Sequence, residues 1–152
     1  MPKSTKNSRH WIIFNKINVP QNIIFISRVN LRKIRKNLQM LTLSEIWIYP
    51  VKSMGGFSVS EALAGPRGLQ HDRRWMLTDE NGRFFTQREI PEMALLGTAV
   101  DGAFLHIFRK TDPSEKILVP LEYAAGALPE ILVKIWDDTC TAWVLPHEIN
   151  NW

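Results

Sequence analysis

One short segment of the sequence combines residue types that suit the binding of an anion. In Tyr49-Pro-Val-Lys-Ser-Met-Gly-Gly, an apolar strand is predicted to end at the proline, which cannot donate a strand hydrogen bond. Lys52 then brings a positive charge, Ser53 brings a hydroxyl, and the two glycines let the backbone approach a partner closely. With free backbone N–H groups, such a turn suits a phosphate or a similar anion. The same residues also fit a solvated lysine in a β-turn, and the local pattern leaves both interpretations open.

Two arginines are predicted to lie near the same end of one β-hairpin. Residues 74–87 form two strand-like segments around an Asn-Gly pair, which supplies the positive φ that tight turns need. Arg73 precedes the first segment and Arg88 follows the second. The planar guanidinium suits phosphate or carboxylate. Alternatively, Asp72 and Glu89 pair with these arginines as ordinary charges at a strand end.

Metal and disulfide chemistry are not indicated by the sequence. Cys140 is the single cysteine, which excludes an internal disulfide framework and a multi-cysteine metal site. It falls inside a predicted strand, so we interpret it as a small core residue. His71 and His106 show no ligand spacing, and no metal site is expected on them. One cysteine fits a reducing compartment, and we expect a cytoplasmic location.

The elements that must position these residues are almost all strands. With 45% apolar and 22% charged residues, the composition is that of an ordinary globular protein. From Leu41 onward, short strand-like segments alternate with turns rich in Gly, Pro, Asn and Asp, including hairpin turns at Asp101-Gly102 and Asp137-Asp138. One helical turn begins near Pro91, and a helix begins at Pro146. We therefore expect a mainly β fold, an antiparallel β-barrel or curved sheet with one or two short helices.

Charge and composition divide the chain near Met40. Residues 1–40 carry a charge of +9 and no acidic residue, whereas residues 41–152 carry −5, which together give the net +4. We expect 1–40 to be a basic, disordered extension, with Met40 as a possible natural start, and 41–152 to be the folded domain. Residues 31–38 could instead form a basic amphipathic helix, or the extension could be a transit-like leader. The acidic folded part is not built as a nucleic-acid surface, and the apolar runs of 1–40 are too short to span a membrane.

Several motifs occur in an order that resembles one protein family. They are Tyr49-Pro-Val-Lys-Ser, Gly68…Asp72-Arg73-x-Trp-Met, Asp79…Gly82-x-Phe-x-Thr-Gln-Arg…Pro91-x-Met, and Val133-x-Ile-Trp136…Ala142…Glu148…Trp152. Together they resemble the N-terminal β-barrel domain of MOSC proteins, which are molybdenum-cofactor enzymes related to the mitochondrial amidoxime-reducing component and its bacterial counterparts. The resemblance runs over about residues 43–152, and residues 1–40 match nothing in it.

The resemblance implies one half of a molybdenum-cofactor oxidoreductase. In the family a catalytic MOSC domain, absent from this chain, follows the barrel and supplies the cysteine that binds molybdenum. Lys52, Ser53 and Arg73 match residues that contact the anionic pterin-phosphate part of the cofactor. Arg88 is a supporting candidate, whereas Arg74 fills a variable position and is not carried over. Family members reduce N-hydroxylated compounds with electrons from a separate redox protein, so we expect the MOSC domain as a partner and no catalytic activity from this domain alone.

A second hypothesis is a stand-alone β-barrel module that binds an anionic ligand or a protein partner. It predicts that Trp136, Trp143 and Trp152 are buried. The accessory-domain hypothesis predicts instead an exposed apolar patch near residues 146–152, where the second domain would dock. A third hypothesis, nucleic-acid binding through residues 1–40, predicts an affinity that falls steeply with salt.

Overall fold

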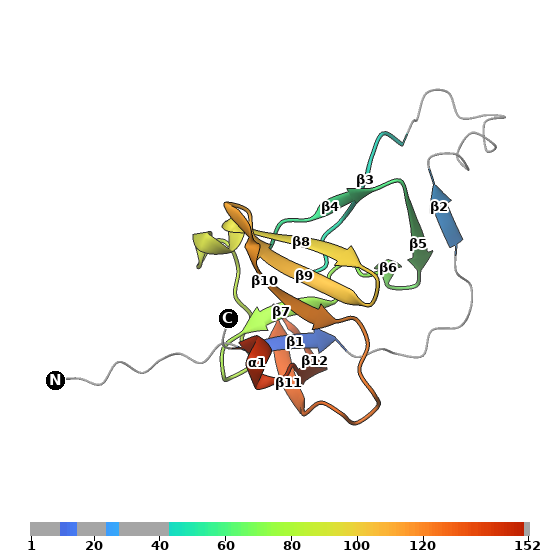
Figure 1. Ribbon diagram of the computed structural model, residues 1–152. Coiled ribbons are helices and arrows are strands. Elements are labelled where there is room, and N and C mark those ends of the chain that lie inside the picture. Colours follow the sequence, from blue (N-terminus) through green and yellow to red (C-terminus); the bar gives the residue numbers. More distant parts are fainter. Residues whose placement is uncertain (1–9, 15–23, 28–42, 151–152) are drawn as a thin grey trace.

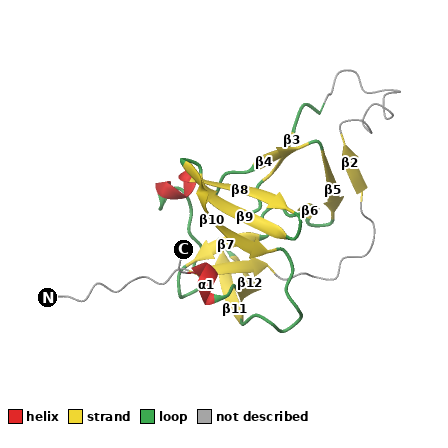
Figure 2. Cartoon of the chain, viewed as in Figure 1, coloured by secondary structure: helices red, strands yellow, loops and turns green. Residues whose placement is uncertain are grey.

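The computed structural model of the chain describes residues 10–14, 24–27 and 43–150, and strands dominate these segments (Figure 1 and Figure 2). In chain order the elements are β1 (His10–Phe14), β2 (Ile24–Ser27), β3 (Ile46–Ile48), β4 (Phe57–Val59), β5 (Glu61–Gly65), β6 (Gly68–Leu69), β7 (Trp75–Thr78), the 3-10 helix η2 (Pro91–Leu95), β8 (Leu96–Asp101), β9 (Phe104–Arg109), β10 (Asp112–Pro120), β11 (Glu130–Ile135), β12 (Asp138–Val144) and α1 (His147–Asn150).

The strands form antiparallel sheets, so the predicted mainly β fold class is confirmed. Within the described residues there are four sheets, with the strand orders β11-β12-β1-β7, β10-β9-β8, β2-β5-β6 and β3-β4. In Figure 1 the β10-β9-β8 sheet lies between the β11-β12-β1-β7 sheet on one side and the two small sheets on the other. The sheets are not closed into one continuous barrel.

The main hydrophobic core lies between the β10-β9-β8 sheet and β7. Leu105 and Ile107 of β9 are fully buried, and they share a cluster with Val119 of β10 and with Trp75 and Leu77 of β7. Every second residue of β9 faces this core, as the two-residue period of a strand requires. The two sheets are therefore held together by side chains that interleave between them.

Strand β7 is buried on both faces, which fixes the loops at its two ends. All four of its residues are buried, as its continuous apolar run indicates. Trp75 and Leu77 face the main core, whereas Met76 faces a second cluster that contains Phe84 and side chains of β11 and β12. The loop that carries Arg73 enters this strand, so its position is set by the two clusters.

The hairpin of β11 and β12 is present, but its turn differs from the prediction by one residue. Ile135 lies opposite Asp138, so Trp136 and Asp137 form the turn rather than Asp137-Asp138. Trp136 has a φ of 56°, in the left-handed region where Asp or Asn would be the ordinary choice. The prediction placed the turn on Asp137-Asp138 because aspartate favours turns, whereas the pairing of β11 with β12 places Trp136 in the turn.

The second strand predicted for the 74–87 hairpin, over residues 83–87, is only partly formed. Phe84 makes a single bridge with Thr78, and the Phe85 N–H donates to the Leu77 carbonyl at 2.9 Å. The same segment also makes a parallel bridge to β11 through Arg83. Because its backbone is shared between β7 and β11, it does not extend as a regular ladder with either.

Two strands belong to the segment for which the sequence predicts a disordered extension. β1 pairs with β7 and β12, and β2 pairs with β5, so these short pieces lie in sheets. The rest of 1–40, including the possible helix over residues 31–38, lies outside the described residues, and the division at residue 40 stays a prediction. Where the structure describes the chain, it contains no helix of the length and apolarity needed to cross a bilayer.

Candidate functional site

The predicted anion-binding residues lie on two loops that run side by side. The loop after β3 carries Lys52 and Ser53, and the loop before β7 carries Arg73. The Lys52 N–H donates to the Trp75 carbonyl at 2.8 Å, and the Arg73 N–H donates to the Tyr49 carbonyl at 2.8 Å. These two backbone hydrogen bonds hold residues 49–52 against residues 73–75, which come much later in the sequence. They thereby place the three residues predicted from the motifs on neighbouring loops.

Backbone strain is concentrated around these loops. Among the described residues, four that are not glycine have a φ in the left-handed region, and each such residue costs of order 1–3 kcal/mol. They are Ser53 at 64°, His71 at 66°, Arg73 at 49° and Trp136 at 56°. Three lie on the two adjoining loops, and the fourth lies beside the Lys52 side chain. Strain at neighbouring positions is typical of a site that evolution holds in place for binding.

The Lys52 side chain points at two aromatic rings rather than into water. Its Nζ lies 3.4 Å from the centre of the Phe84 ring and 5.3 Å from that of Trp136. The two rings meet edge to face with their centres 5.1 Å apart. Nζ is buried and has no hydrogen-bond partner among the described residues. A cation placed over ring faces gains an electrostatic attraction that replaces part of its hydration.

Burial lowers the pKa of Lys52 from its ordinary value of 10.5. Desolvation disfavours the charged form, and no carboxylate among the described residues counteracts it. The buried ammonium therefore adds positive potential to this part of the protein, while its nitrogen is covered by the two rings.

Three backbone N–H groups of the turn that carries Lys52 and Ser53 are not free, although the sequence suggested free ones. The Met54 N–H donates to the Val51 carbonyl at 3.3 Å, and the Gly55 N–H donates to the Leu96 carbonyl at 3.0 Å. The Lys52 N–H is already paired with β7. For these three groups the expectation was wrong, because they are bonded within the turn or to neighbouring strands.

The two glycines after this turn serve the packing of the chain itself. A Cβ on Gly56 would lie 2.4 Å from the Ile48 carbonyl oxygen and 2.7 Å from the Tyr49 ring. A Cβ on Gly55 would lie 3.0 Å from the Leu96 carbonyl oxygen. The close partner predicted from the sequence is therefore neighbouring backbone, and no ligand is needed to explain these glycines.

Arg73 is the most accessible of the three predicted residues. Its side chain is 66% exposed, and Nη1 donates to Asp72 Oδ2 at 2.7 Å. The other oxygen of Asp72 accepts the Tyr49 N–H at 2.9 Å, and the guanidinium lies 5.9 Å from the centre of the Tyr49 ring. Asp72 thus fixes the loop and orients Arg73, while most of the guanidinium donors remain open to an anion.

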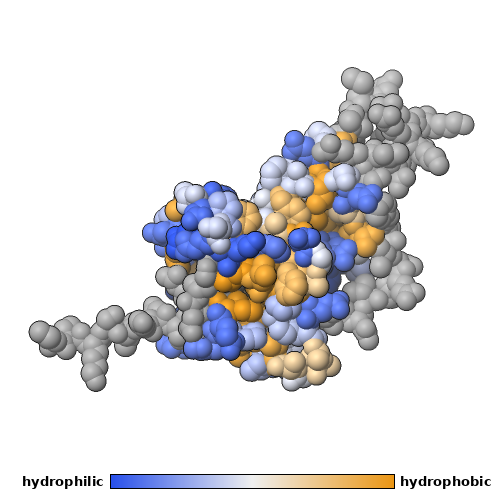
Figure 3. All heavy atoms as spheres, in the orientation of Figure 1, coloured by the Kyte–Doolittle hydropathy of each residue, from blue (hydrophilic) through white to orange (hydrophobic). Residues whose placement is uncertain are grey.

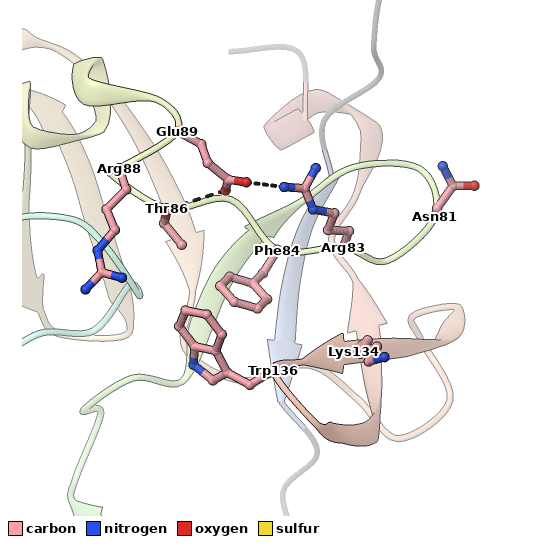
Figure 4. A pocket seen from close by; sticks show the side chains of 8 residues that line it. All are labelled: Asn81, Arg83, Phe84, Thr86, Arg88, Glu89, Lys134 and Trp136. Atoms are coloured by element: carbon pink, nitrogen blue, oxygen red, sulfur yellow. Dashed lines mark hydrogen bonds and ion pairs between the residues drawn. The ribbon is translucent and has the colours of Figure 1, made fainter.

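A pocket of about 540 Å³ is lined by this aromatic pair. Figure 4 shows Phe84 and Trp136 at its centre, with Arg88 on one side and Arg83 and Lys134 on the other. Its lining residues are Asn81, Arg83, Phe84, Thr86, Arg88, Glu89, Lys134 and Trp136. The motifs had pointed to Arg88 alone among these as a binding residue, and neither Ser53 nor Arg73 lines the pocket.

The charges of the pocket are only partly paired. Glu89 accepts a short hydrogen bond from Arg83, and Thr86 donates to its other oxygen at 3.4 Å. The sequence left open that Asp72 and Glu89 pair with Arg73 and Arg88 as ordinary charges. The pairing of Asp72 with Arg73 is confirmed, whereas the pairing of Glu89 with Arg88 is wrong, because Glu89 pairs with Arg83. Within the described part of the chain, Arg88 forms no ion pair and stays exposed.

Residues considered for metal chemistry lie apart from one another. In the described segments, no group of three His, Cys, Asp or Glu side chains could hold a metal ion. Cys140 is half-buried in β12 against the Phe84 cluster, and burial raises the pKa of its thiol. It packs as the small core residue that the sequence predicted. His71 stacks on Trp75, with ring centres 6.5 Å apart.

Large apolar side chains are exposed, but none of them lies at residues 146–150, the described part of the patch that the accessory-domain hypothesis predicted. In the predicted patch, Ile149 is half-buried against the main core, and the preceding Leu145 is buried. Trp136 is instead 64% exposed, contrary to the stand-alone hypothesis, while Trp143 is half-buried and Trp152 lies outside the described residues. Figure 3 shows hydrophobic residues gathered at the centre of one face and bordered by hydrophilic ones.

Comparison with known proteins gives consistent matches over the folded part of the chain. The family model described as MOSC N-terminal beta barrel domain matches residues 40–152. Molybdenum cofactor sulfurase of Danio rerio is 38% identical over 88 residues, which cover 58% of this chain and 11% of that protein. Mitochondrial amidoxime reducing component 2 of Homo sapiens is 36% identical over 91 residues, which cover 57% of this chain and 27% of that protein.

The matched region is a small part of these relatives. Mitochondrial amidoxime reducing component 2 of Rattus norvegicus is 32% identical over 99 residues, which cover 62% of this chain and 29% of that protein. The chain thus spans less than a third of the length of these curated relatives. No solved structure matches the chain significantly.

Proposed function

The chain belongs to the family of MOSC N-terminal beta barrel domains, and from this membership we propose that it is the cofactor-contacting accessory domain of a molybdenum-cofactor oxidoreductase. The resemblance read from the motifs is confirmed by the family match. Its relatives are named for molybdenum cofactor sulfuration and for amidoxime reduction, which supports a role connected with this cofactor. Lys52, Ser53 and Arg73 are the residues proposed to contact the anionic phosphate of its pterin part.

The observation that carries this proposal is the joining of two strained loops by backbone hydrogen bonds. Ser53 and Arg73 both adopt a left-handed φ, and the loops are tied together at 2.8 Å through Lys52 and Trp75. The Arg73 guanidinium is open to solvent, and the Lys52 ammonium has no hydrogen-bond partner in the described part of the chain. The exposed Arg73 guanidinium and the Ser53 hydroxyl lie on adjoining turns and support a phosphate contact, and the buried Lys52 ammonium adds positive charge on the same turn as Ser53.

The remaining chemistry is assigned to a partner. The cofactor supplies the redox chemistry when bound, and this chain offers charge and shape for holding one end of it. We propose a catalytic MOSC domain as the partner that completes the site, and a separate redox protein as the electron donor. Because half of the cofactor's surroundings come from the partner, this chain alone is expected to bind a pterin phosphate weakly. A cytoplasmic location is our expectation from the single cysteine, although two of the relatives carry mitochondrial in their names.

A titration followed by backbone amide NMR tests the proposal. The full chain is titrated with inorganic phosphate and with a pterin monophosphate, first alone and then with a purified MOSC domain added in trans. We expect shifts to cluster at Ser53, at Gly55-Gly56 and at Arg73, and to saturate at lower ligand concentration once the second domain is present.

Two variants make the result specific. Arg73→Ala removes the exposed guanidinium and should abolish the clustered shifts. Arg109→Ala is the matched control, because Arg109 is half-exposed and paired with Glu115 at 2.7 Å on the β9–β10 hairpin. A well-folded chain that shows no clustered shift at the two loops, both alone and with the second domain, would refute the proposal.

A further inference from the structure

We propose that the pocket at Phe84 and Trp136 is a binding site for a planar heteroaromatic ligand that carries a negative group. The ligand ring would stack on the Trp136 indole, and its anionic group would lie near Arg88 or Lys134. This proposal goes beyond the phosphate contacts assigned to Ser53 and Arg73, because neither of those residues lines the pocket.

The position of Trp136 is the first observation behind this assignment. The residue lies in a two-residue hairpin turn with a φ of 56°, where a bulky side chain is strained. A turn of this kind is normally built from Gly, Asn or Asp, which adopt the conformation easily. The indole is also 64% exposed, so burial of its surface does not explain why a tryptophan is placed there.

The aromatic pair has a defined arrangement that leaves part of the indole open. Phe84 supports Trp136 edge to face at 5.1 Å, and the Lys52 ammonium lies against both rings. These contacts hold the indole on one side, while its remaining surface lines the pocket. An aromatic ring fixed in this way forms a stacking platform, and stacking on such platforms suits any ligand with a flat ring.

The charges around the platform select for an anion. The pocket is lined by three basic side chains and one carboxylate, and that carboxylate is occupied by Arg83. Arg88 and Lys134 are exposed and form no ion pair among the described residues. The Lys52 ammonium, which has no hydrogen-bond partner among the described residues, adds positive potential where it contacts the two rings. A neutral aromatic ligand would stack on the Trp136 indole but would not be attracted by these cations. Inorganic phosphate would be attracted by the cations but could not stack on the indole.

The experiment is a titration of the full chain with guanosine monophosphate, guanosine and inorganic phosphate. The indole N–H signal of Trp136, assigned by its loss in Trp136→Phe, reports stacking directly. We expect saturable shifts of this signal with guanosine monophosphate, and at least tenfold weaker effects with guanosine or phosphate alone. A pterin monophosphate distinguishes two sources of the same chemistry. Tenfold tighter binding than the nucleotide identifies the cofactor ring as the occupant, and equal binding identifies a free nucleotide; both outcomes support the pocket.

Variants separate the platform from general effects on folding. Trp136→Gly suits the left-handed backbone and removes the platform, so the folded variant should bind guanosine monophosphate at least tenfold more weakly, as expected for loss of one stacked ring. Trp136→Phe should retain part of the affinity, and Arg88→Ala should weaken binding of the nucleotide but not of guanosine. Leu132→Ala is the control that should change nothing, because Leu132 is 69% exposed on β11, the strand that leads into the turn at Trp136.

The result is independent of the proposed phosphate contact at Arg73. Arg73→Ala should leave the affinity for guanosine monophosphate unchanged, although it should abolish phosphate shifts at the two loops. If guanosine monophosphate produces no saturable shift of the Trp136 indole, or if Trp136→Gly binds as well as the natural chain, the pocket assignment is wrong. That outcome would leave the proposal for Ser53 and Arg73 intact.

Discussion

Replacing Lys52 with methionine should make the protein more stable while removing a group proposed to bind an anion. The Lys52 ammonium is buried without a hydrogen-bond partner among the described residues and lies 3.4 Å from the centre of the Phe84 ring. Lys52→Met shortens the side chain by one atom and keeps an unbranched chain that can pack against the ring, but removes the charge. The expected result is a higher free energy of unfolding together with weaker phosphate binding, as is common where a site is built for function.

The size of the effect follows from three contributions. An unsatisfied buried polar group costs about 1–3 kcal/mol, and more when it is charged, whereas contact of a cation with an aromatic face returns about 0.5–2 kcal/mol. Methionine replaces the latter with a sulfur–aromatic contact of about 0.3–1.5 kcal/mol. The difference favours the Lys52→Met variant by roughly 1 kcal/mol at neutral pH.

The pH dependence provides a second readout of the same effect. Burial lowers the pKa of Lys52 below 10.5, so the folded protein releases this proton more easily than the unfolded chain does. The destabilisation is complete below the folded pKa and disappears as the pH rises towards 10.5. The advantage of Lys52→Met should therefore be largest near pH 7 and smaller near pH 10.

Urea unfolding at both pH values measures this difference. Lys134→Met is the matched control, because Lys134 is an exposed lysine of the neighbouring pocket and its replacement should change the free energy of unfolding by less than about 0.5 kcal/mol. A loss of about 1 kcal/mol or more in Lys52→Met at pH 7 would refute the reasoning, since the cation–ring contact would then outweigh the desolvation of the ammonium.

Four further changes test other parts of the structure by thermal or urea unfolding. Trp136→Gly should unfold with about 1 kcal/mol more free energy than Trp136→Ala, because only glycine relieves the left-handed φ of 56°; the reverse order would contradict the turn. Gly56→Ala should cost about 2 kcal/mol or more, because its Cβ would lie 2.4 Å from the Ile48 carbonyl oxygen. Asp72→Ala should cost about 1–2 kcal/mol through loss of the hydrogen bond that holds the Arg73 loop, and an unchanged midpoint would count against that bond. Tyr123→Phe should gain about 1 kcal/mol, because the Tyr123 hydroxyl is buried without a partner among the described residues and burial raises its pKa to about 12.

Much of the fold could be predicted because its strands carry a clear two-residue period. Alternation in the first core strand separates Ile46 and Ile48, which are buried, from Trp47 and Tyr49, which are exposed. The hairpin around Asp101-Gly102 was also readable, because Gly102 adopts the positive φ that a tight turn needs, although Asp101 pairs with Phe104 and the two turn residues are Gly102 and Ala103. Local residue preferences and the tertiary structure agree on these elements, so the sequence alone located them to within one residue.

The errors occur where neighbouring elements override local preference. The turn after β11 falls on Trp136 because pairing of β11 with β12 fixes the register, and no local rule places a tryptophan in the left-handed region. The segment after Gly82 reads as a strand, yet its backbone is divided between β7 and β11. The N–H groups near Ser53 were expected to be free, but those of Lys52 and Gly55 donate to strands from other parts of the chain. The last two errors concern partners that are distant in sequence, whereas the first concerns the register of one hairpin.

The candidate site was likewise predictable only in part, because residue types identify a candidate such as Lys52 but not the side chains that it contacts in the folded protein. Lys52 was recognisable as a candidate from its motif, but its ammonium meets Phe84 and Trp136, which lie 32 and 84 positions further along the chain. Pairing of β11 with β12 fixes the turn at Trp136, while bridges to β7 and β11 hold the segment that carries Phe84, so the platform exists only in the folded state. The strained backbone of Trp136 is consequently stabilised by the whole of the second cluster. A substitution that loosens this cluster at Val133 should weaken ligand binding at Trp136 before it unfolds the domain.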